Sequence, residues 1–147
     1  MRDKLNILLV EDDDVDVEAI MRAFRRNNVA ASFTVASNGL DALQILRGES
    51  ETGRIDQPYL ILLDINLPQM NGVEFLQVLR NDPQLRQSIV FVLTTSNRDE
   101  DKLAVYHWQV AGYLLKFETG PEYSGVIKLL NCYRQMVKFP PRLQAAA

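Results

Sequence analysis

The feature that most constrains the fold is the segment Leu60–Pro68, which reads LILLDINLP. It is entirely aliphatic up to Asp64. An apolar run of this length between turn-forming residues is typical of a strand that is buried on both faces of a sheet. Asp64 should lie at the carboxyl end of this strand, where open α/β sheets bind their ligands. Because an unpaired buried carboxylate is costly, the sequence predicts that cations surround Asp64 and that it is the reactive residue.

Length and composition indicate a folded protein of ordinary type. The 147 residues suit a single domain, residues 1–147. The net charge of −3, without a block of Lys or Arg, argues against nucleic-acid and membrane-surface binding. Cys132 is the single cysteine and is expected to be a buried or half-buried apolar filler. With no signal peptide and no run of membrane-spanning length, we expect a cytoplasmic protein.

Strand-like runs alternate with helix-like segments along the whole chain. The strands are expected at residues 5–10, 32–36, 60–64, 89–93 and 112–116. This alternation predicts the α/β class, with a parallel sheet and helices on both faces. The expected architecture is a doubly wound five-stranded parallel sheet, flavodoxin-like (βα)5, with strand order 2-1-3-4-5. The ordered core should span about residues 5–138, followed by a C-terminal tail over residues 139–147.

Several helix ends carry capping signals. Asp13 or Asp14 is expected to cap the first helix. Asn97 and Glu100 have the spacing of a capping box, which predicts the start of the fourth helix. The last helix is expected over residues 121–138, with its proline in the first turn.

Chemically suitable side chains follow four of the predicted strands. Glu11 and Asp12 follow the first strand, and Asp64, Thr94 and Lys116 end the third, fourth and fifth. These ends meet at one edge of a parallel sheet, where the carboxylates would repel one another unless a cation joined them. Oxygen ligands without His or Cys suit Mg²⁺ or Mn²⁺. Together with an ammonium and a hydroxyl group, they suit transfer of a phosphoryl group to an aspartate nucleophile.

Four motifs in one order carry a resemblance to a known family. The chain resembles the receiver domain of response regulators in bacterial two-component signalling, over about residues 5–138. The motifs are Val10–Asp12, Leu62–Pro68 with Gly72, Leu93–Ser96 and Gly112–Lys116.

The resemblance implies roles for the acidic residues. Asp64 is the expected phosphoacceptor, which takes its phosphoryl group from a sensor histidine kinase. Asp12 is the expected direct metal ligand, and Glu11 is expected to reach the metal through water. The backbone carbonyl of Asn66 is a further expected ligand.

The resemblance also implies a switch. Thr94 is the expected hydroxyl that moves toward the phosphoryl group, Lys116 its salt-bridging ammonium, and Tyr113 the coupled aromatic side chain. The expected protein is a signalling component that catalyses only its own phosphorylation and dephosphorylation, and not a metabolic enzyme.

Two residues depart from the common pattern of the family. Phe117 stands where Pro commonly follows the lysine in a cis peptide, so we predict a trans Lys116–Phe117 bond and an altered loop. Thr95 stands where the family often has Ala or Gly, and its side chain is expected to slow hydrolysis of the phosphoryl group.

The details of the motifs resemble those of stand-alone regulators paired with phytochrome-type histidine kinases, so we expect no attached output domain. The last helix carries apolar residues on more than one face, so one face is a candidate partner or homodimer surface. The interface candidates are Phe117, Tyr123, Leu129, Tyr133, Met136 and Phe139.

Three other function classes remain open at this stage. An aspartate-nucleophile phosphatase of the haloacid-dehalogenase type would need an acid two residues after Asp64, but that position is Asn66. A pseudo-receiver that only dimerises would not need the full acidic set. A flavin-binding protein would place its phosphate at the loop after the first strand, which here is acidic and repels anions.

Overall fold

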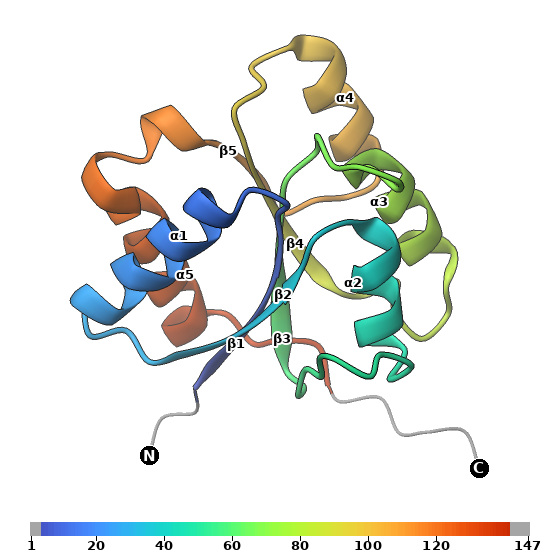
Figure 1. Ribbon diagram of the computed structural model, residues 1–147, viewed down its shortest axis with the longest axis horizontal. Coiled ribbons are helices and arrows are strands. Elements are labelled where there is room, and N and C mark those ends of the chain that lie inside the picture. The colour runs from blue at the N-terminus through green and yellow to red at the C-terminus, as the bar shows by residue number, and fades with distance from the viewer. Residues whose placement is uncertain (1–3, 142–147) are drawn as a thin grey trace.

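The computed structural model describes residues 4–141 and contains one five-stranded sheet in which all neighbouring strands are parallel (Figure 1). The strand order is β2-β1-β3-β4-β5, as the sequence predicts. The strands are β1 (Leu5–Val10), β2 (Ala31–Ala36), β3 (Tyr59–Leu63), β4 (Ile89–Thr94) and β5 (Gly112–Leu115). The flavodoxin-like fold is therefore confirmed.

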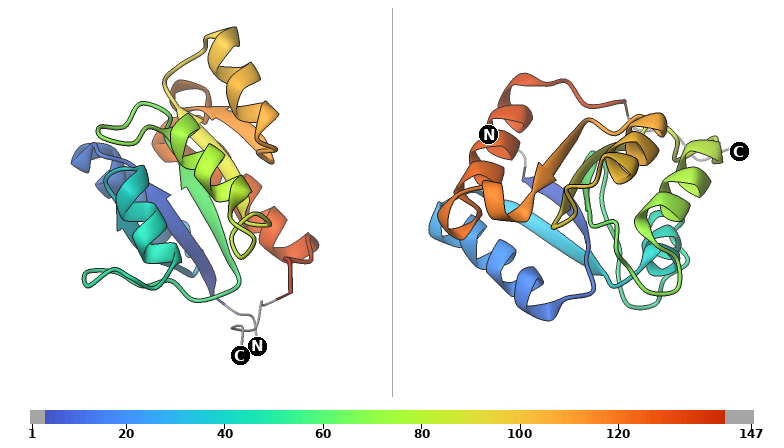
Figure 2. Two further views of the ribbon diagram at one scale, coloured as in Figure 1. Left: turned by 90° about the vertical axis from the view of Figure 1, so that its right-hand side faces the viewer. Right: turned by 90° about the horizontal axis from the view of Figure 1, so that it is seen from above.

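Helices cover both faces of the sheet, and each face has its own hydrophobic cluster. Helices α1 and α5 pack on one face, and α2, α3 and α4 on the other, as the right panel of Figure 2 shows from above. The helices are α1 (Asp14–Arg26), α2 (Gly39–Leu46), α3 (Gly72–Asn81), α4 (Asp99–His107) and α5 (Ser124–Met136). Two short 3-10 helices, η1 (Lys116–Glu118) and η2 (Pro121–Tyr123), connect β5 to α5.

The central strand β3 is buried on both faces, as its aliphatic run predicts. Residues 60–63 are 0% exposed. Leu60 and Leu62 pack into the cluster under α1 and α5, whereas Ile61 and Leu63 pack into the cluster on the other face. Successive side chains of a strand point to opposite faces, so a continuous run of aliphatic residues is what a central strand of a doubly wound sheet requires.

One predicted cap is confirmed and another is wrong. The side chain of Asp13 caps α1 by accepting hydrogen bonds from the backbone of residues 15 and 16. The Asn97–Glu100 capping box does not form, because α4 begins after Arg98 without a side-chain cap. Ser96 organises this loop instead, since its Oγ accepts a bond from Arg98 N (3.4 Å) and donates one to Asp101 Oδ2 (2.5 Å).

The predicted start of the last helix is also wrong. Residues 121–123 form η2, and α5 begins at Ser124 and ends at Met136. Glu122 and Tyr123 have positive φ values of 51° and 57°, which breaks the helix before Ser124. The Lys116–Phe117 peptide is trans, as predicted. Within residues 4–141, the cis peptide bond is the one between Gln57 and Pro58.

Cys132 is exposed, so the prediction of a buried filler is wrong. The inward face of α5 consists of Val126, Ile127 and Leu130. Cys132 follows Leu130 by two positions, about 200° around the helix, which turns it away from the core.

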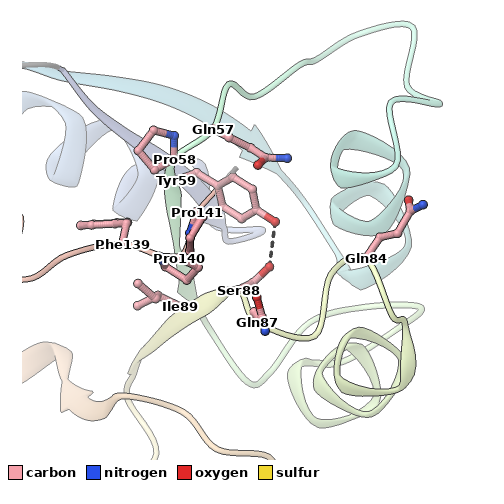
Figure 3. A pocket seen from close by; sticks show the side chains of 10 residues that line it. All are labelled: Gln57, Pro58, Tyr59, Gln84, Gln87, Ser88, Ile89, Phe139, Pro140 and Pro141. Atoms are coloured by element: carbon pink, nitrogen blue, oxygen red, sulfur yellow. Dashed lines mark hydrogen bonds between the residues drawn. The ribbon is translucent and has the colours of Figure 1, made fainter. Parts of the chain in front are cut away.

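The chain after α5 returns to the amino-terminal ends of β3 and β4. Phe139 packs edge-on against Tyr133, with ring centroids 5.8 Å apart. Figure 3 shows residues 139–141 lining a small pocket with Tyr59 and Ser88, whose hydroxyl groups are 2.7 Å apart. The rest of the predicted tail, residues 142–147, lies outside the described residues. Within residues 4–141, no helix is long and apolar enough to cross a membrane.

Candidate functional site

The carboxyl edge of the sheet gathers the side chains that the sequence singles out. Glu11 follows β1, Asp64 follows β3, Thr94 ends β4 and Lys116 follows β5. Strand order brings these ends together, because β1 pairs with β3 and β3 with β4. Residues more than 100 positions apart in the chain, such as Glu11 and Lys116, are therefore in direct contact.

Lys116 lies at the centre of this group. Its Nζ donates hydrogen bonds to Glu11 Oε1 (2.5 Å), Asp16 Oδ2 (2.7 Å) and Asp64 Oδ2 (3.2 Å). The side chains of Lys116, Glu11 and Asp64 are 9%, 3% and 10% exposed, and that of Asp16 is 28% exposed. One buried ammonium thus serves three carboxylates from three different elements.

Asp16 is a member of the site that sequence reasoning missed. It lies in the first turn of α1, outside every motif that the sequence analysis singles out. One signal could have found it: Ile20 is fully buried, so the position four residues earlier faces the same way.

Lys116 offsets only part of the negative charge of the three carboxylates that it contacts. Burial raises the pKa of Glu11 to about 7 despite its hydrogen bond with Lys116, and the negative charge of Asp64 adds to the shift. Burial alone would lower the pKa of Lys116, but its hydrogen bonds with Asp16 and Glu11 outweigh this effect and raise it. Lys116 therefore carries its positive charge at neutral pH, and the three carboxylates together carry more negative charge than it offsets.

Both oxygens of Asp64 are held in place. Oδ1 accepts hydrogen bonds from Thr94 Oγ1 (2.7 Å) and from the backbone N–H of Ile65 (2.7 Å). Oδ2 accepts the longer bond from Lys116 (3.2 Å). Thr94 is fully buried, and its hydroxyl group donates to Asp64.

Gly72, at the start of α3, fixes the backbone that carries Asp64. Its N–H donates to the carbonyl of Ile65 (2.8 Å). A Cβ at position 72 would lie 2.7 Å from the carbonyl oxygen of Asp64 and 2.8 Å from Cα of Ile65. The glycine is therefore required by the close approach of α3 to the loop after β3.

The residues fit a hard divalent cation in donor type and charge. Asp12 is exposed next to Glu11, and no hydrogen bond or ion pair of its side chain is found within residues 4–141. Across that same range, no three His, Cys, Asp or Glu side chains are already gathered around a metal position. The ammonium group of Lys116 is bonded to both Glu11 and Asp64. Oxygen donors with surplus negative charge suit Mg²⁺ or Mn²⁺.

A chain of hydrogen bonds leads from Thr94 to α4 and β5. The backbone N–H of Ser96 donates to Thr94 Oγ1 (3.4 Å), and the Ser96 hydroxyl donates to Asp101 of α4. The hydroxyl group of Tyr113 donates to the backbone carbonyl of Ser96 (2.8 Å). Burial raises the pKa of Tyr113, which keeps this donor protonated. Two of the three predicted switch residues, Thr94 and Tyr113, are thus connected through Ser96, whereas Lys116 is bonded to Asp64.

The predicted interface candidates fall into two groups. Phe117, Leu129 and Met136 are exposed, with Phe117 at 67% and Met136 at 75%. Tyr123, Tyr133 and Phe139 are half-buried and pack against the core cluster under α1 and α5. The structure therefore does not present all six on one exposed surface.

Comparison with known proteins identifies the family. The family model described as "Response regulator receiver domain" matches residues 7–124. The chain belongs to this family, whose members are phosphoacceptors in two-component signalling.

Two relatives with similar sequences agree with this family assignment. The chain is 36% identical over 110 residues to response regulator Rcp1 of Synechocystis sp., with 75% of each chain covered. It is 39% identical over 114 residues to the probable methanogenesis regulatory protein FilR2 of Methanothrix harundinacea, covering 78% of this chain and 73% of the relative.

Solved structures agree with the sequence relatives. The phosphorylated cyanobacterial phytochrome response regulator RcpA superposes with a TM-score of 0.80 at 30% identity, covering 95% of this chain and all of RcpA (100%). The Mn²⁺-bound form of Rcp1 gives a TM-score of 0.78 at 29% identity, with 93% and 99% covered. The chain is therefore similar over nearly its whole length to stand-alone response regulators linked to phytochromes.

The contact between Gly72 and the loop of Asp64 yields the first prediction. Gly72→Ala should lower the free energy of unfolding by about 1–3 kcal/mol, because the added methyl group forces backbone to move. Gly53→Ala is the matched control, since its Cβ would meet only side-chain carbons of Thr34 and Ile45, at 3.2 Å or more. Urea unfolding measures both. Equal losses in the two variants would contradict the role assigned to Gly72.

Proposed function

We propose that Asp64 is the residue of this receiver domain that accepts a phosphoryl group, and that the donor is the phosphohistidine of a sensor histidine kinase. The observation that carries the proposal is the placement of Asp64 at the carboxyl edge of the sheet, with Thr94 bonded to one oxygen and Lys116 to the other. A carboxylate held in this way has a fixed orientation for attack on phosphorus.

Asp64 acts as the nucleophile in this transfer. A P–O bond forms between an Asp64 oxygen and phosphorus as the P–N bond of the phosphohistidine breaks, and the electron pair of the broken bond stays on the imidazole nitrogen. Oδ2 is the more available oxygen, because it accepts one hydrogen bond, from Lys116 (3.2 Å), whereas Oδ1 accepts three, from Thr94 and from the backbone N–H groups of residues 65 and 66.

Thr94 and Lys116 are the donors that the chain offers to the phosphoryl oxygens. Their hydrogen bonds now go to Asp64, so each needs only a short movement to reach a group attached to it. Glu11, Asp12 and Asp64, with the backbone carbonyl of Asn66, would hold Mg²⁺ or Mn²⁺, which supplies positive charge to those oxygens. The Mn²⁺-bound structure of Rcp1 supports a divalent ion in this family.

Movement of Thr94 gives the signal a path to the surface. Ser96 is bonded to Thr94, to Tyr113 and to Asp101 of α4, so a shift of the Thr94 hydroxyl changes the support of α4 and β5 together. Only Val105 of α4 is fully buried, and Leu103 is 73% exposed. A helix with so few buried side chains can be repositioned at low cost, which alters the surface offered to partners.

The donor kinase is proposed to be of the phytochrome type, and the protein to form a homodimer. RcpA and the bacteriophytochrome response regulator RtBRR, which has a TM-score of 0.74 at 30% identity, support the pairing. Phe117, Leu129 and Met136 supply exposed apolar area around α5 for the dimer. A Met136→Lys variant that is as dimeric as the wild type in sedimentation would contradict this surface.

Phosphorylation by a small donor tests the proposal directly. Incubation with acetyl phosphate and Mg²⁺ should add one phosphoryl group to the wild type and none to Asp64→Asn, as read by intact mass. Asp56→Asn is the control, because it removes an exposed carboxylate just before β3, at the opposite edge of the sheet. Phosphorylation of Asp64→Asn would refute the assignment, and turnover of external phosphate esters would favour a phosphatase instead.

Dependence on the divalent ion tests the acidic residues. Removal of Mg²⁺ by EDTA should abolish the mass gain. Asp12→Asn should raise the Mg²⁺ concentration for half-maximal phosphorylation by at least about 10-fold, because it removes a direct ligand. Asp14→Asn removes the same charge from the next turn and should change that concentration by less than about twofold. An equal effect of the two variants would contradict Asp12 as a ligand.

A further inference from the structure

We propose that Asp16 is a positioning residue for Lys116: it holds the ammonium group in the unphosphorylated protein and gives it up to the phosphoryl group on Asp64. The inference rests on the proposed role of Asp64 as the phosphoacceptor. It assigns a function to a side chain in the first turn of α1 that lies outside the four sequence motifs.

The distances show where Lys116 is held. Its Nζ lies 2.7 Å from Asp16 Oδ2 but 3.2 Å from Asp64 Oδ2. Charge-assisted bonds are strongest at about 2.7–2.9 Å, so the stronger contact of the two is with Asp16. Lys116 must loosen this contact if it is to bind a group attached to Asp64.

Exposure decides which carboxylate can release Lys116. The side chain of Glu11 is 3% exposed, whereas that of Asp16 is 28% exposed. A buried carboxylate that loses its cation pays the full cost of desolvation, but a partly exposed one can be hydrated again. Asp16 is therefore the partner whose bond is broken most easily when a phosphoryl group competes for the ammonium.

Asp16 also connects Lys116 to the segment before α5. Its other oxygen, Oδ1, lies 3.4 Å from the hydroxyl group of Tyr123, which donates to it. Burial and the charge of Asp16 raise the pKa of Tyr123 to about 12, so the phenol remains a donor at neutral pH. A change in the partners of Asp16 therefore changes the hydrogen bond that Tyr123 donates.

The position of the segment that contains Tyr123 depends on its contacts with α1. Glu122 and Tyr123 both have left-handed backbone conformations, which are unfavourable in residues other than glycine and persist only where surrounding contacts hold them. The segment packs against α1, as the orange part of Figure 1 shows beside the blue helix. Its other tie to α1 is the ion pair of Arg26 with Glu122, which is largely exposed and therefore weak. Release of Lys116 by Asp16 would thus reach the first turn of α5 by a route separate from Thr94 and Ser96.

The test uses beryllofluoride with saturating Mg²⁺, which mimics a phosphoryl group on a carboxylate, and reads its occupancy from the ¹⁹F NMR signal of the bound form. Asp16→Asn should bind beryllofluoride about 3- to 10-fold more tightly than the wild type, because the partly exposed competitor for Lys116 has lost its charge. Asp16→Glu keeps the carboxylate and should return the affinity to within about twofold of the wild type.

Asp14→Asn is the matched control. Asp14 lies in the same first turn and carries the same charge, but it makes no bond to Lys116. Equal affinities of Asp16→Asn and Asp14→Asn would overturn the inference, since the effect would then be one of general charge. Failure of the wild type to bind beryllofluoride would instead refute the role of Asp64.

The resonances of Tyr123 provide a second readout, in the wild type and in Asp16→Asn. Beryllofluoride should shift them in the wild type. In unliganded Asp16→Asn they should already differ from the wild type and move less on binding. Unchanged Tyr123 resonances in the liganded wild type would overturn the connection through Asp16.

Discussion

The structure depends on one buried ammonium group that is shared by three carboxylates. Lys116 joins Glu11, Asp16 and Asp64, which come from the end of β1, the first turn of α1 and the end of β3. Without it, these negative charges would repel one another in a site that is largely closed to water. The same ammonium group also serves the proposed reaction, because a phosphoryl group on Asp64 would bind Lys116 in place of one of these carboxylates.

Two sets of hydrogen bonds leave this centre in different directions. One runs from Asp64 through Thr94 and Ser96 to Tyr113 and to the start of α4. The other runs from Lys116 through Asp16 to Tyr123, before α5. The first set ends on α4, which buries only Val105 fully, and the second ends on the segment before α5, which holds two left-handed residues. A local change of charge can therefore alter two neighbouring parts of the surface.

The sequence predicts the sheet well because its strands are aliphatic runs that only a buried parallel sheet can accommodate. It also predicts that the side chains of Asp64, Thr94 and Lys116 meet at the carboxyl edge of the sheet, because each directly ends a strand. It fails where two local signals compete or where no local signal exists. Asn97 has the spacing of a capping residue, but Ser96 accepts the backbone hydrogen bond in this loop. Neither Glu122 nor Tyr123 is a residue type that predicts a left-handed backbone conformation. Asp16 lies four residues before Ile20, but its contact with Lys116 arises from tertiary packing, which no local pattern predicts.

Thermal unfolding of Lys116→Met tests the shared ammonium most directly, because methionine keeps the length of the side chain and removes its charge. The three carboxylates would then lack a cation, so Mg²⁺ should raise the unfolding temperature of the variant by more than it raises that of the wild type. An equal or smaller increase in the variant would show that Lys116 does not balance these charges, and would contradict the account.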